Sequence, residues 1–276
     1  MSKIIKIKNF SVSNNLPFFL IAGPCQMESK EHAFFMAENI KKITDELGIN
    51  FIYKTSYDKA NRTSIKSKRG MGIEDSLKVF EGIRNKFNLP ILTDVHTSEQ
   101  CEAIKDVVDI IQIPAFLCRQ TDLLISAAKT QKIINIKKGQ FLAPWDMKNV
   151  IKKVSESGND NILTTERGVS FGYNTLVSDM RSLSILKNED YPVIFDATHS
   201  VQQPGGKGEE SGGERKFIYD LSKAAISVGV AGLFVEVHDD PDNAPSDGHN
   251  MLHLKDLKNF LIKIKKIDNL IKEEKL

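Results

Sequence analysis

The sequence predicts one (β/α)8 barrel, a TIM barrel, from two observations. Short apolar runs rich in β-branched residues alternate eight times with longer segments of helical spacing, the pattern of βα units around a parallel sheet. The length of 276 residues is close to the ~250 residues typical of this fold. The first turn lacks a GxGxxG sequence, which disfavours a doubly wound open sheet. We therefore expect a single domain over residues 1–276.

The elements follow in order along the chain. Residues 1–17 alternate apolar and polar side chains around Asn14-Asn15, so we expect a hairpin that caps the barrel floor. The Gly-rich stretch 200–215 follows the seventh strand, where we expect a mobile active-site loop. Barrel strands are expected at 18–23, 50–56, 90–96, 109–115, 132–138, 161–168, 192–198 and 231–238. Helices are expected at 32–48, 73–88, 98–108, 121–131, 146–156 and 217–229, with an amphipathic helix at 252–276.

The composition is that of a soluble globular protein, with 41% apolar and 27% charged residues. Lys and Arg total 38 against 36 acidic residues, so net charge gives no reason to expect a nucleic acid or an anionic membrane as partner. We expect no secretory leader, because residues 1–15 lack a long apolar region, and no apolar run reaches the ~18 residues that span a membrane. We expect a cytoplasmic protein whose three cysteines stay free or bind metal.

Positive side chains gather at the predicted strand ends, where the active site of an α/β barrel forms. They are Lys54, Lys59, Arg62, Lys137 and Arg167. Cations crowded into one mouth repel one another unless anions bind, so the cluster indicates substrates with phosphate or carboxylate groups. A solvated Lys-rich surface is the alternative. Because the chain has no Walker-type loop, we do not expect the anion to be a nucleotide.

A second group combines a thiol, an imidazole and two carboxylates. Barrel closure brings the first, seventh and eighth strands together, and with them Cys25, His199, Glu236 and Asp247. These donors suit a divalent ion such as Zn²⁺, Fe²⁺ or Mn²⁺. The residues are scattered in sequence, however, and they also have purely structural explanations. Cys25 can be a buried thiol at a strand end, His199 a hydrogen-bonded core imidazole, and Glu236 the partner of a nearby lysine.

Several segments together carry a resemblance that spans nearly the whole chain. They are KTSYDKANRTS, LTDVH, IQIPAFLCRQTDLL, NIKKGQF, TERGVSFGY, FDATHSVQQPGG, SGGER and LFVEVHDDPDNAPSDG. They resemble the 3-deoxy-D-manno-octulosonate 8-phosphate synthases. The resemblance implies a transferase that condenses phosphoenolpyruvate with D-arabinose 5-phosphate and water on a (β/α)8 barrel. Its products would be inorganic phosphate and an eight-carbon sugar acid phosphate used for the lipopolysaccharide inner core.

The same resemblance implies a role for each matching residue. Lys59, with Lys54 and Ser56, would serve the carboxylate of phosphoenolpyruvate. Its phosphate would be held by Lys137 and Arg167, helped by Gln112 and the backbone around Ala115. Asn61 and Arg62 would bind the sugar, and Arg119 would reach the sugar phosphate from a neighbouring subunit of the homotetramer usual in this family. The residues implied as catalytic are Lys59, Asp94, Lys137 and His199.

The family has a metal-dependent and a metal-independent branch, which differ at the position of Cys25: the first has Cys in a Gly-Pro-Cys turn, the second Asn. The sequence here reads AGPC, so the resemblance implies a divalent metal held by Cys25, His199, Glu236 and Asp247. The alternatives are a 3-deoxy-arabino-heptulosonate 7-phosphate synthase that uses erythrose 4-phosphate, a sialic acid synthase, or a non-catalytic metabolite-binding barrel. The first resembles Lys-Pro-Arg-Thr where this chain reads KANRTS, and the second usually carries a further domain.

Overall fold

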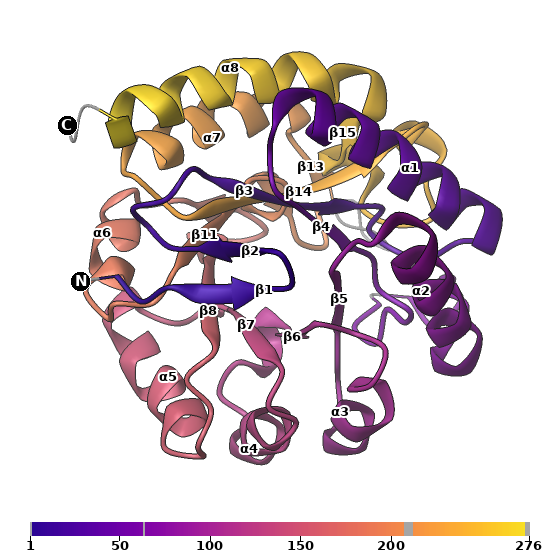
Figure 1. Cartoon of the computed structure of the whole chain (residues 1–276), viewed down its shortest axis with the longest axis horizontal. Coiled ribbons are helices and arrows are strands. Elements are labelled where there is room, and N and C mark those ends of the chain that lie inside the picture. Colours follow the sequence, from indigo (N-terminus) through magenta and orange to yellow (C-terminus); the bar gives the residue numbers. More distant parts are fainter. Residues whose placement is uncertain (1, 63, 207–211, 274–276) are drawn as a thin grey trace.

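The computed structural model of the protein describes residues 2–62, 64–206 and 212–273, and it confirms the barrel. Eight parallel strands pair in the order β11-β8-β7-β6-β5-β4-β3-β14, and pairing of β11 with β14 closes the ring (Figure 1). The barrel strands are β3 (Phe19–Gly23), β4 (Phe51–Lys54), β5 (Ile91–Asp94), β6 (Ile110–Ile113), β7 (Ile133–Lys137), β8 (Ile162–Glu166), β11 (Val193–Asp196) and β14 (Gly232–His238).

In the described part of the chain, eight α-helices surround the barrel (Figure 1). The first, α1 (Lys30–Leu47), begins where the Ser29 side chain accepts the His32 amide, and it ends at Gly48 in the left-handed conformation. The sequence did not predict α6, which is seven residues long and has no side-chain cap. The other helices are α2 (Ile73–Phe87), α3 (Ser98–Ile104), α4 (Thr121–Lys129), α5 (Met147–Ser155), α6 (Arg181–Lys187), α7 (Ile218–Ser227) and α8 (Leu254–Glu273).

Each barrel strand is buried on both faces, which explains why the strands read as continuous apolar runs. Along β3, Phe19 and Ile21 belong to the cluster inside the barrel, whereas Leu20 and Ala22 belong to the larger cluster between barrel and helices. Among the helices that the structure describes, none has the length and apolar character needed to cross a membrane.

The N-terminal hairpin caps the barrel floor as predicted (Figure 1). It consists of β1 (Ile5–Ile7) and β2 (Phe10–Val12), which pair antiparallel. Ile5, Ile7 and Val12 are buried in the same apolar cluster as the inward side chains of the barrel strands. The hairpin therefore closes the lower end of the barrel and leaves the opposite end for chemistry.

Asn14 and Asn15 form a turn as predicted, in which the Leu16 amide donates to the Ser13 carbonyl at 3.2 Å, but this turn follows the hairpin and does not join its two strands. Ile7 pairs with Phe10, so Lys8 and Asn9 form the turn, and Lys8 takes a positive φ of 48°. Asn14 has another role: it is buried, donates from Nδ2 to the carbonyl of Tyr191 at 2.9 Å and accepts the amide of Val193 at 2.8 Å. Its side chain thereby fastens the hairpin to the start of β11.

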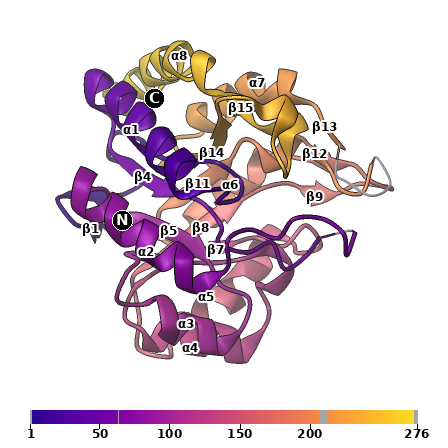
Figure 2. The ribbon, with the colours of Figure 1, turned by 90° about the vertical axis from the view of Figure 1, so that its right-hand side faces the viewer.

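Short strands lie at the end of the barrel opposite the hairpin (Figure 2). They were not predicted, because two-residue strands carry no readable alternation. They are β9 (Val169–Ser170) with β10 (Leu176–Val177), β12 (Gln202–Gln203) with β13 (Gly212–Gly213), and β15 (Leu252–His253) beside β14. Part of the loop predicted to be mobile, residues 207–211, lies outside the described residues, as does Thr63 of the KANRTS motif.

Candidate active site

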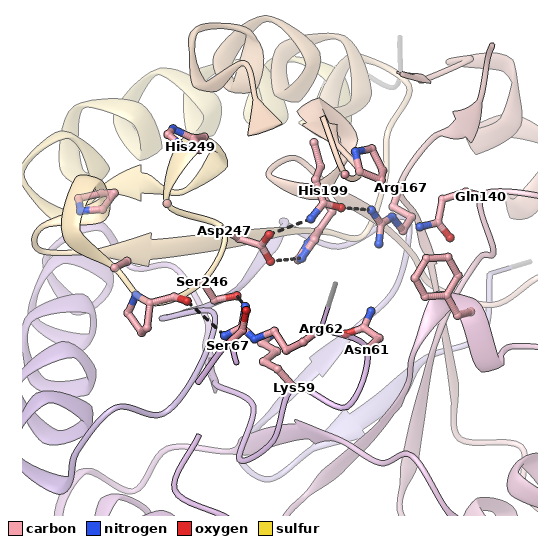
Figure 3. Close-up of a pocket in the computed structure, with 18 of the residues that line it drawn as sticks. Lys59, Asn61, Arg62, Ser67, Gln140, Arg167, His199, Ser246, Asp247 and His249 are labelled. Atoms are coloured by element: carbon pink, nitrogen blue, oxygen red, sulfur yellow. Dashed lines mark hydrogen bonds and ion pairs between the residues drawn. The ribbon is translucent and has the colours of Figure 1, made fainter. Parts of the chain in front are cut away.

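A cavity of about 530 Å³ opens at the C-terminal end of the strands (Figure 3). Its lining includes loops after β4, β7, β8, β11 and β14. The cavity is strongly polar, as expected for anionic substrates. Predicted site residues on its wall are Lys59, Asn61, Arg62, Arg167, His199 and Asp247. The other predicted residues, apart from Arg119, lie on or directly after barrel strands and are buried: Cys25, Lys54, Ser56, Asp94, Gln112, Ala115, Lys137 and Glu236.

The structure brings the four predicted metal ligands together. Cys25 Sγ lies 3.1 Å from Asp247 Oδ2. His199 Nε2 lies 3.6 Å from Glu236 Oε1 and 3.9 Å from Asp247 Oδ2. Asp247 is held in the left-handed region at φ 53°, a conformation that costs free energy outside glycine. Residues from β14 and from the segments after β3, β11 and β14 thus converge on one point.

This donor set fits a divalent cation. Glu236 is fully buried, yet its Oε2 has no hydrogen-bond partner among the described residues. A buried carboxylate oxygen left unpaired is costly, and a cation would satisfy it. One thiol, one imidazole and two carboxylates are ligands that Zn²⁺ and Fe²⁺ accept. Burial, together with Glu236, raises the pKa of the Cys25 thiol well above its ordinary value, so loading a metal must displace the thiol proton.

Glu236 is ionised despite its burial. Burial alone would raise the pKa of its carboxyl, but the neighbouring His199 and Lys54 outweigh this and lower it to about 2. Lys54 Nζ lies 3.1 Å from Glu236 Oε1 and is itself 2% exposed. Lys54 therefore neutralises a carboxylate in the absence of ligands, in addition to the substrate role that the sequence implied.

Asp196 orients the imidazole of His199. The backbone amide of His199 donates to Asp196 Oδ1 at 2.9 Å, and Nδ1 of its ring lies 2.8 Å from Asp196 Oδ2. Since Nδ1 carries the proton in this arrangement, Nε2 is free to present its lone pair toward Glu236 and Asp247. The predicted site did not include Asp196, although its position at the end of the seventh strand, three residues before His199, was a usable signal.

Lys137 and Arg167 provide the positive charge expected at a phosphate-binding site. The Lys137 ammonium donates to the Asp196 carboxylate and lies 3.2 Å from the centre of the Phe234 ring. Burial lowers the pKa of Lys137, Asp196 partly offsets this, and the result is about 8. Arg167 donates from Nη2 to Gln202 Oε1 at 2.8 Å, and its Nε has no partner among the described residues.

Lys59 and Asp94 lie beside these groups. Lys59 Nζ donates to Ser56 Oγ at 3.1 Å, which confirms that these two residues are neighbours. Burial lowers the pKa of Lys59, but Cys25, Glu236 and Asp94 outweigh that effect and raise it. Asp94 contacts His96 Nε2 at 3.0 Å, and its Oδ1 is buried without a partner in the described part of the chain. That oxygen is available for a substrate hydroxyl.

A buried polar chain supports Gln112. Thr165 donates to Asn135 Oδ1 at 2.6 Å, and Asn135 Nδ2 donates to Gln112 Oε1 at 3.1 Å. The acceptor of the Gln112 amide is thus occupied, which leaves its NH₂ group to face an anion. Ala115, the first residue of the 3-10 helix η1 (Ala115–Leu117), follows on the same segment and is 5% exposed.

Arg62 holds two loops together at the edge of the cavity. Its Nη1 donates to Ser246 Oγ at 2.7 Å (Figure 3) and its Nη2 to the carbonyl of Pro245 at 3.2 Å. Nη2 also donates to Gln26. Asn61 lines the same wall. Ser246, Gln202 and Gln140 also line the cavity and were not among the predicted site residues, because neutral polar residues in loops carry no distinctive sequence signal.

Arg119 is the one predicted residue that the chain does not bring to this cavity, as far as the described residues show. It is exposed and lines a separate cavity of about 240 Å³ with Asp146 and Lys153. Lys153 Nζ donates to the Arg119 carbonyl at 3.0 Å. Within one chain, Arg119 therefore cannot be counted as part of the site.

The fold and the cavity define a class: a (β/α)8-barrel enzyme whose polar mouth gathers cations for anionic substrates beside a thiol–imidazole–carboxylate group. The chain belongs to the DAHP synthetase I family, whose sequence profile matches residues 3–273. It is 62% identical over 268 residues to 2-dehydro-3-deoxyphosphooctonate aldolase of Brucella anthropi, covering 97% of each chain. It is 61% identical over 270 residues to the protein of the same name from Bartonella henselae, covering 98% of this chain and 97% of the other.

Proposed function

We propose that this protein condenses phosphoenolpyruvate with D-arabinose 5-phosphate and water, releasing 3-deoxy-D-manno-octulosonate 8-phosphate and inorganic phosphate. The observation that carries the proposal is the 60–62% identity, over 97–98% of the chain, to proteins named for 2-dehydro-3-deoxyphosphooctonate, which is the same eight-carbon product. The fold and the crowded cations of the cavity support it independently. The product would serve lipopolysaccharide synthesis in the cytoplasm.

The cavity offers the groups that this chemistry needs. C3 of phosphoenolpyruvate forms a bond to the aldehyde carbon of the sugar, and a water oxygen adds to C2. The resulting hemiketal phosphate then breaks its C2–O bond and expels phosphate. Lys137 and Arg167 would hold the phosphate, and Lys59 with Ser56 the carboxylate. Fixing both substrates in near-attack geometry supplies much of the rate.

The sugar end distinguishes the proposal from its nearest rival. Asn61 and Arg62 line the outer wall, where the distal part of the acceptor would lie. The test is phosphate release from phosphoenolpyruvate with D-arabinose 5-phosphate or with erythrose 4-phosphate as acceptor. Faster release with the pentose phosphate supports the proposal, whereas preference for the tetrose phosphate indicates the seven-carbon product. No release with either acceptor favours a barrel that only binds metabolites.

A divalent metal would be held by Cys25, His199, Glu236 and Asp247. The fit of this donor set and the unpaired Glu236 oxygen support the proposal. When bound, such an ion supplies Lewis acidity and can orient water or an aldehyde oxygen. The protein itself would keep the ligands in place, through Asp196 on His199 and through Lys54 on Glu236.

A homotetramer would complete the site across a subunit interface. Arg119 is exposed and is not among the residues that line the main cavity, which supports a role toward another chain. Three large apolar side chains between residues 116 and 145 are also exposed, which is typical of a surface that a second subunit covers. They are Phe116, Phe141 and Trp145, at 53%, 56% and 64% exposure. Sedimentation equilibrium would give the subunit number.

A further inference from the structure

A second cluster of metal-binding side chains lies outside the cavity. It consists of Glu28, directly before the cap of α1, His32 in the first turn of α1, His238 at the end of β14, and Asp239 after it. One ligand atom from each of Glu28, His32 and His238 lies within 4.8 Å of the others. The two imidazole rings lie with their centroids 4.7 Å apart. We call these four residues the histidine-pair cluster.

His32 is oriented as a ligand would be. Its Nε2 lies 3.0 Å from Asp239 Oδ1, which fixes the ring and places the proton on Nε2. Its Nδ1 is buried and has no hydrogen-bond partner among the described residues; the nearest anionic oxygen, Glu28 Oε1, is 4.0 Å away. An imidazole that gives its proton to a carboxylate and leaves the other nitrogen unpaired is the usual arrangement beside a metal.

His238 faces the same point from the strand side. Its Nε2 lies 2.7 Å from Glu28 Oε1, and its Nδ1 lies 3.2 Å from Asp239 Oδ1 and 2.9 Å from the Asp240 amide. Without metal, the Asp240 amide donates to Nδ1, so the ring proton is on Nε2, which donates to Glu28. With a metal bound at Nε2, the neutral ring would carry its proton on Nδ1 and donate it to Asp239. Metal binding at His238 therefore breaks the hydrogen bond from the Asp240 amide.

We propose that the histidine-pair cluster binds a second divalent transition-metal ion of the zinc class. The ligands are Nδ1 of His32, Nε2 of His238 and the carboxylate of Glu28. Asp239 lies within hydrogen-bond distance of the other nitrogen of each imidazole. Two histidines and one carboxylate are a common zinc ligand set that leaves one position open. Glu28 retains 29% side-chain exposure, so the carboxylate can adjust and solvent can occupy the open position.

This cluster would bind metal more weakly than the cysteine-containing group, because it lacks a thiolate and must break the Asp240 contact. Both groups draw on the loop after β3 and on β14, since Cys25 and Glu28 belong to the former and Glu236 and His238 to the latter. The second ion would thus bind near the first without sharing a ligand with it. The proposal does not depend on the reaction that the cavity catalyses.

Equilibrium dialysis of the full-length protein against Zn²⁺, after chelator treatment, tests the proposal. We expect two equivalents for the wild type and one for Glu28→Gln, for His32→Asn and for Cys25→Ala. Glu31→Gln, which removes an exposed carboxylate from the same helical turn, should retain two. Circular dichroism establishes that each variant is folded.

The proposal is overturned if the folded wild type binds one equivalent, or if both Glu28→Gln and His32→Asn keep two. Co²⁺ absorption separates the two sites, since only the cysteine-containing group gives a thiolate charge-transfer band. A Cys25→Ala protein that still takes up Co²⁺ without that band supports the second site. Failure of that variant to bind any Co²⁺ contradicts it. These readouts do not involve turnover, so they stand apart from the proposed synthase activity.

Discussion

The carboxylate of Asp196 joins Lys137 to His199. One of its oxygens, Oδ2, accepts both the Lys137 ammonium and Nδ1 of His199, and the carboxylate is fully buried. Burial would raise the pKa of this carboxyl, but His199 and Lys137 hold it well below its usual range. The expected phosphate-binding lysine and the expected metal-binding histidine are therefore positioned by the same group, which the sequence did not identify as part of the site.

Replacing Asp196 with Asn should impair both functions together. The amide cannot accept both hydrogen bonds as an anion, so His199 loses its orientation and Lys137 its counter-ion. Groups that orient metal ligands typically contribute 10–100-fold, and we expect a loss of roughly that size in metal affinity and in kcat. Metal content and steady-state rates measure the effect. Asp220→Asn, which breaks an exposed pair with Lys223, should change neither; an unaltered Asp196→Asn enzyme would contradict the assignment.

The pH profile should report the ammonium of Lys137. Its pKa is lowered from 10.5 to about 8 because burial opposes the charge more than Asp196 stabilises it. As pH rises through 8, the free enzyme loses this positive charge, so kcat/KM for phosphoenolpyruvate should fall about tenfold per pH unit above that value. Bound phosphate favours the charged form and should shift the corresponding fall in kcat to higher pH. In Lys137→Arg the fall in kcat/KM should occur at higher pH. A wild-type kcat/KM that stays constant up to pH 10 would refute the role of the Lys137 ammonium in binding phosphoenolpyruvate.

Removing the thiol should reduce metal binding. In Cys25→Asn the cluster keeps His199, Glu236 and Asp247 but loses the soft ligand, so we expect substoichiometric metal after dialysis and lower activity. Elemental analysis of the purified variant measures it, with Cys101→Ser as the control because Cys101 is buried in α3. Activity of the wild type should vanish on chelation and return with divalent metal. Unchanged metal content in Cys25→Asn would exclude Cys25 as a ligand.

Arg62→Ala should affect the sugar phosphate more than phosphoenolpyruvate. The guanidinium lines the cavity wall, whereas Lys137, on which the other phosphate is expected, is buried at the end of β7. Loss of one charged hydrogen-bonding group costs about 1.5–3 kcal/mol, or roughly 10–100-fold in KM for the pentose phosphate. Arg69→Ala serves as the control, because Arg69 lies on the same loop but pairs with Asp58 at the surface. Equal losses for both substrates would refute the assignment of the two ends.

Asn14→Ala should destabilise the fold without altering the chemistry. It leaves the Val193 amide and the Tyr191 carbonyl without their buried partner, at a cost of about 2–4 kcal/mol. Urea unfolding measures this free energy. Asn15→Ala, at the exposed neighbouring position, should change it by less than about 0.5 kcal/mol. Equal stability of the two variants would show that Asn14 does not fasten the hairpin.

The barrel could be predicted because its strands are buried on both faces, which leaves long apolar runs such as the one through β3. The hairpin turn could not, because Asn14-Asn15 carries the stronger local turn signal while Lys8 adopts its positive φ for the sake of the strand pairing. The α6 helix and the two-residue strands are too short to show a period.

The charged members of the site could be predicted because barrel topology fixes which strand ends meet. The strand-end position of Asp196 was a usable signal for its place in the site, but its role, like that of Gln202, depends on partners such as Lys137 and Arg167 that lie 59 and 35 residues away. For Arg119, a role was implied by the resemblance alone. In the described part of the single chain, Arg119 does not line the main cavity but a separate, smaller one.

The contact between Cys25 and Asp247 joins residues separated by 222 positions. Cys25 follows the first barrel strand, and Asp247 lies in a loop after the last barrel strand. The candidate metal site therefore cannot exist on a nascent chain until nearly all of it has been synthesised. A fragment that stops before residue 247 would lack one of the four candidate ligands, so we expect the complete donor set only once the loop after the last barrel strand has been made.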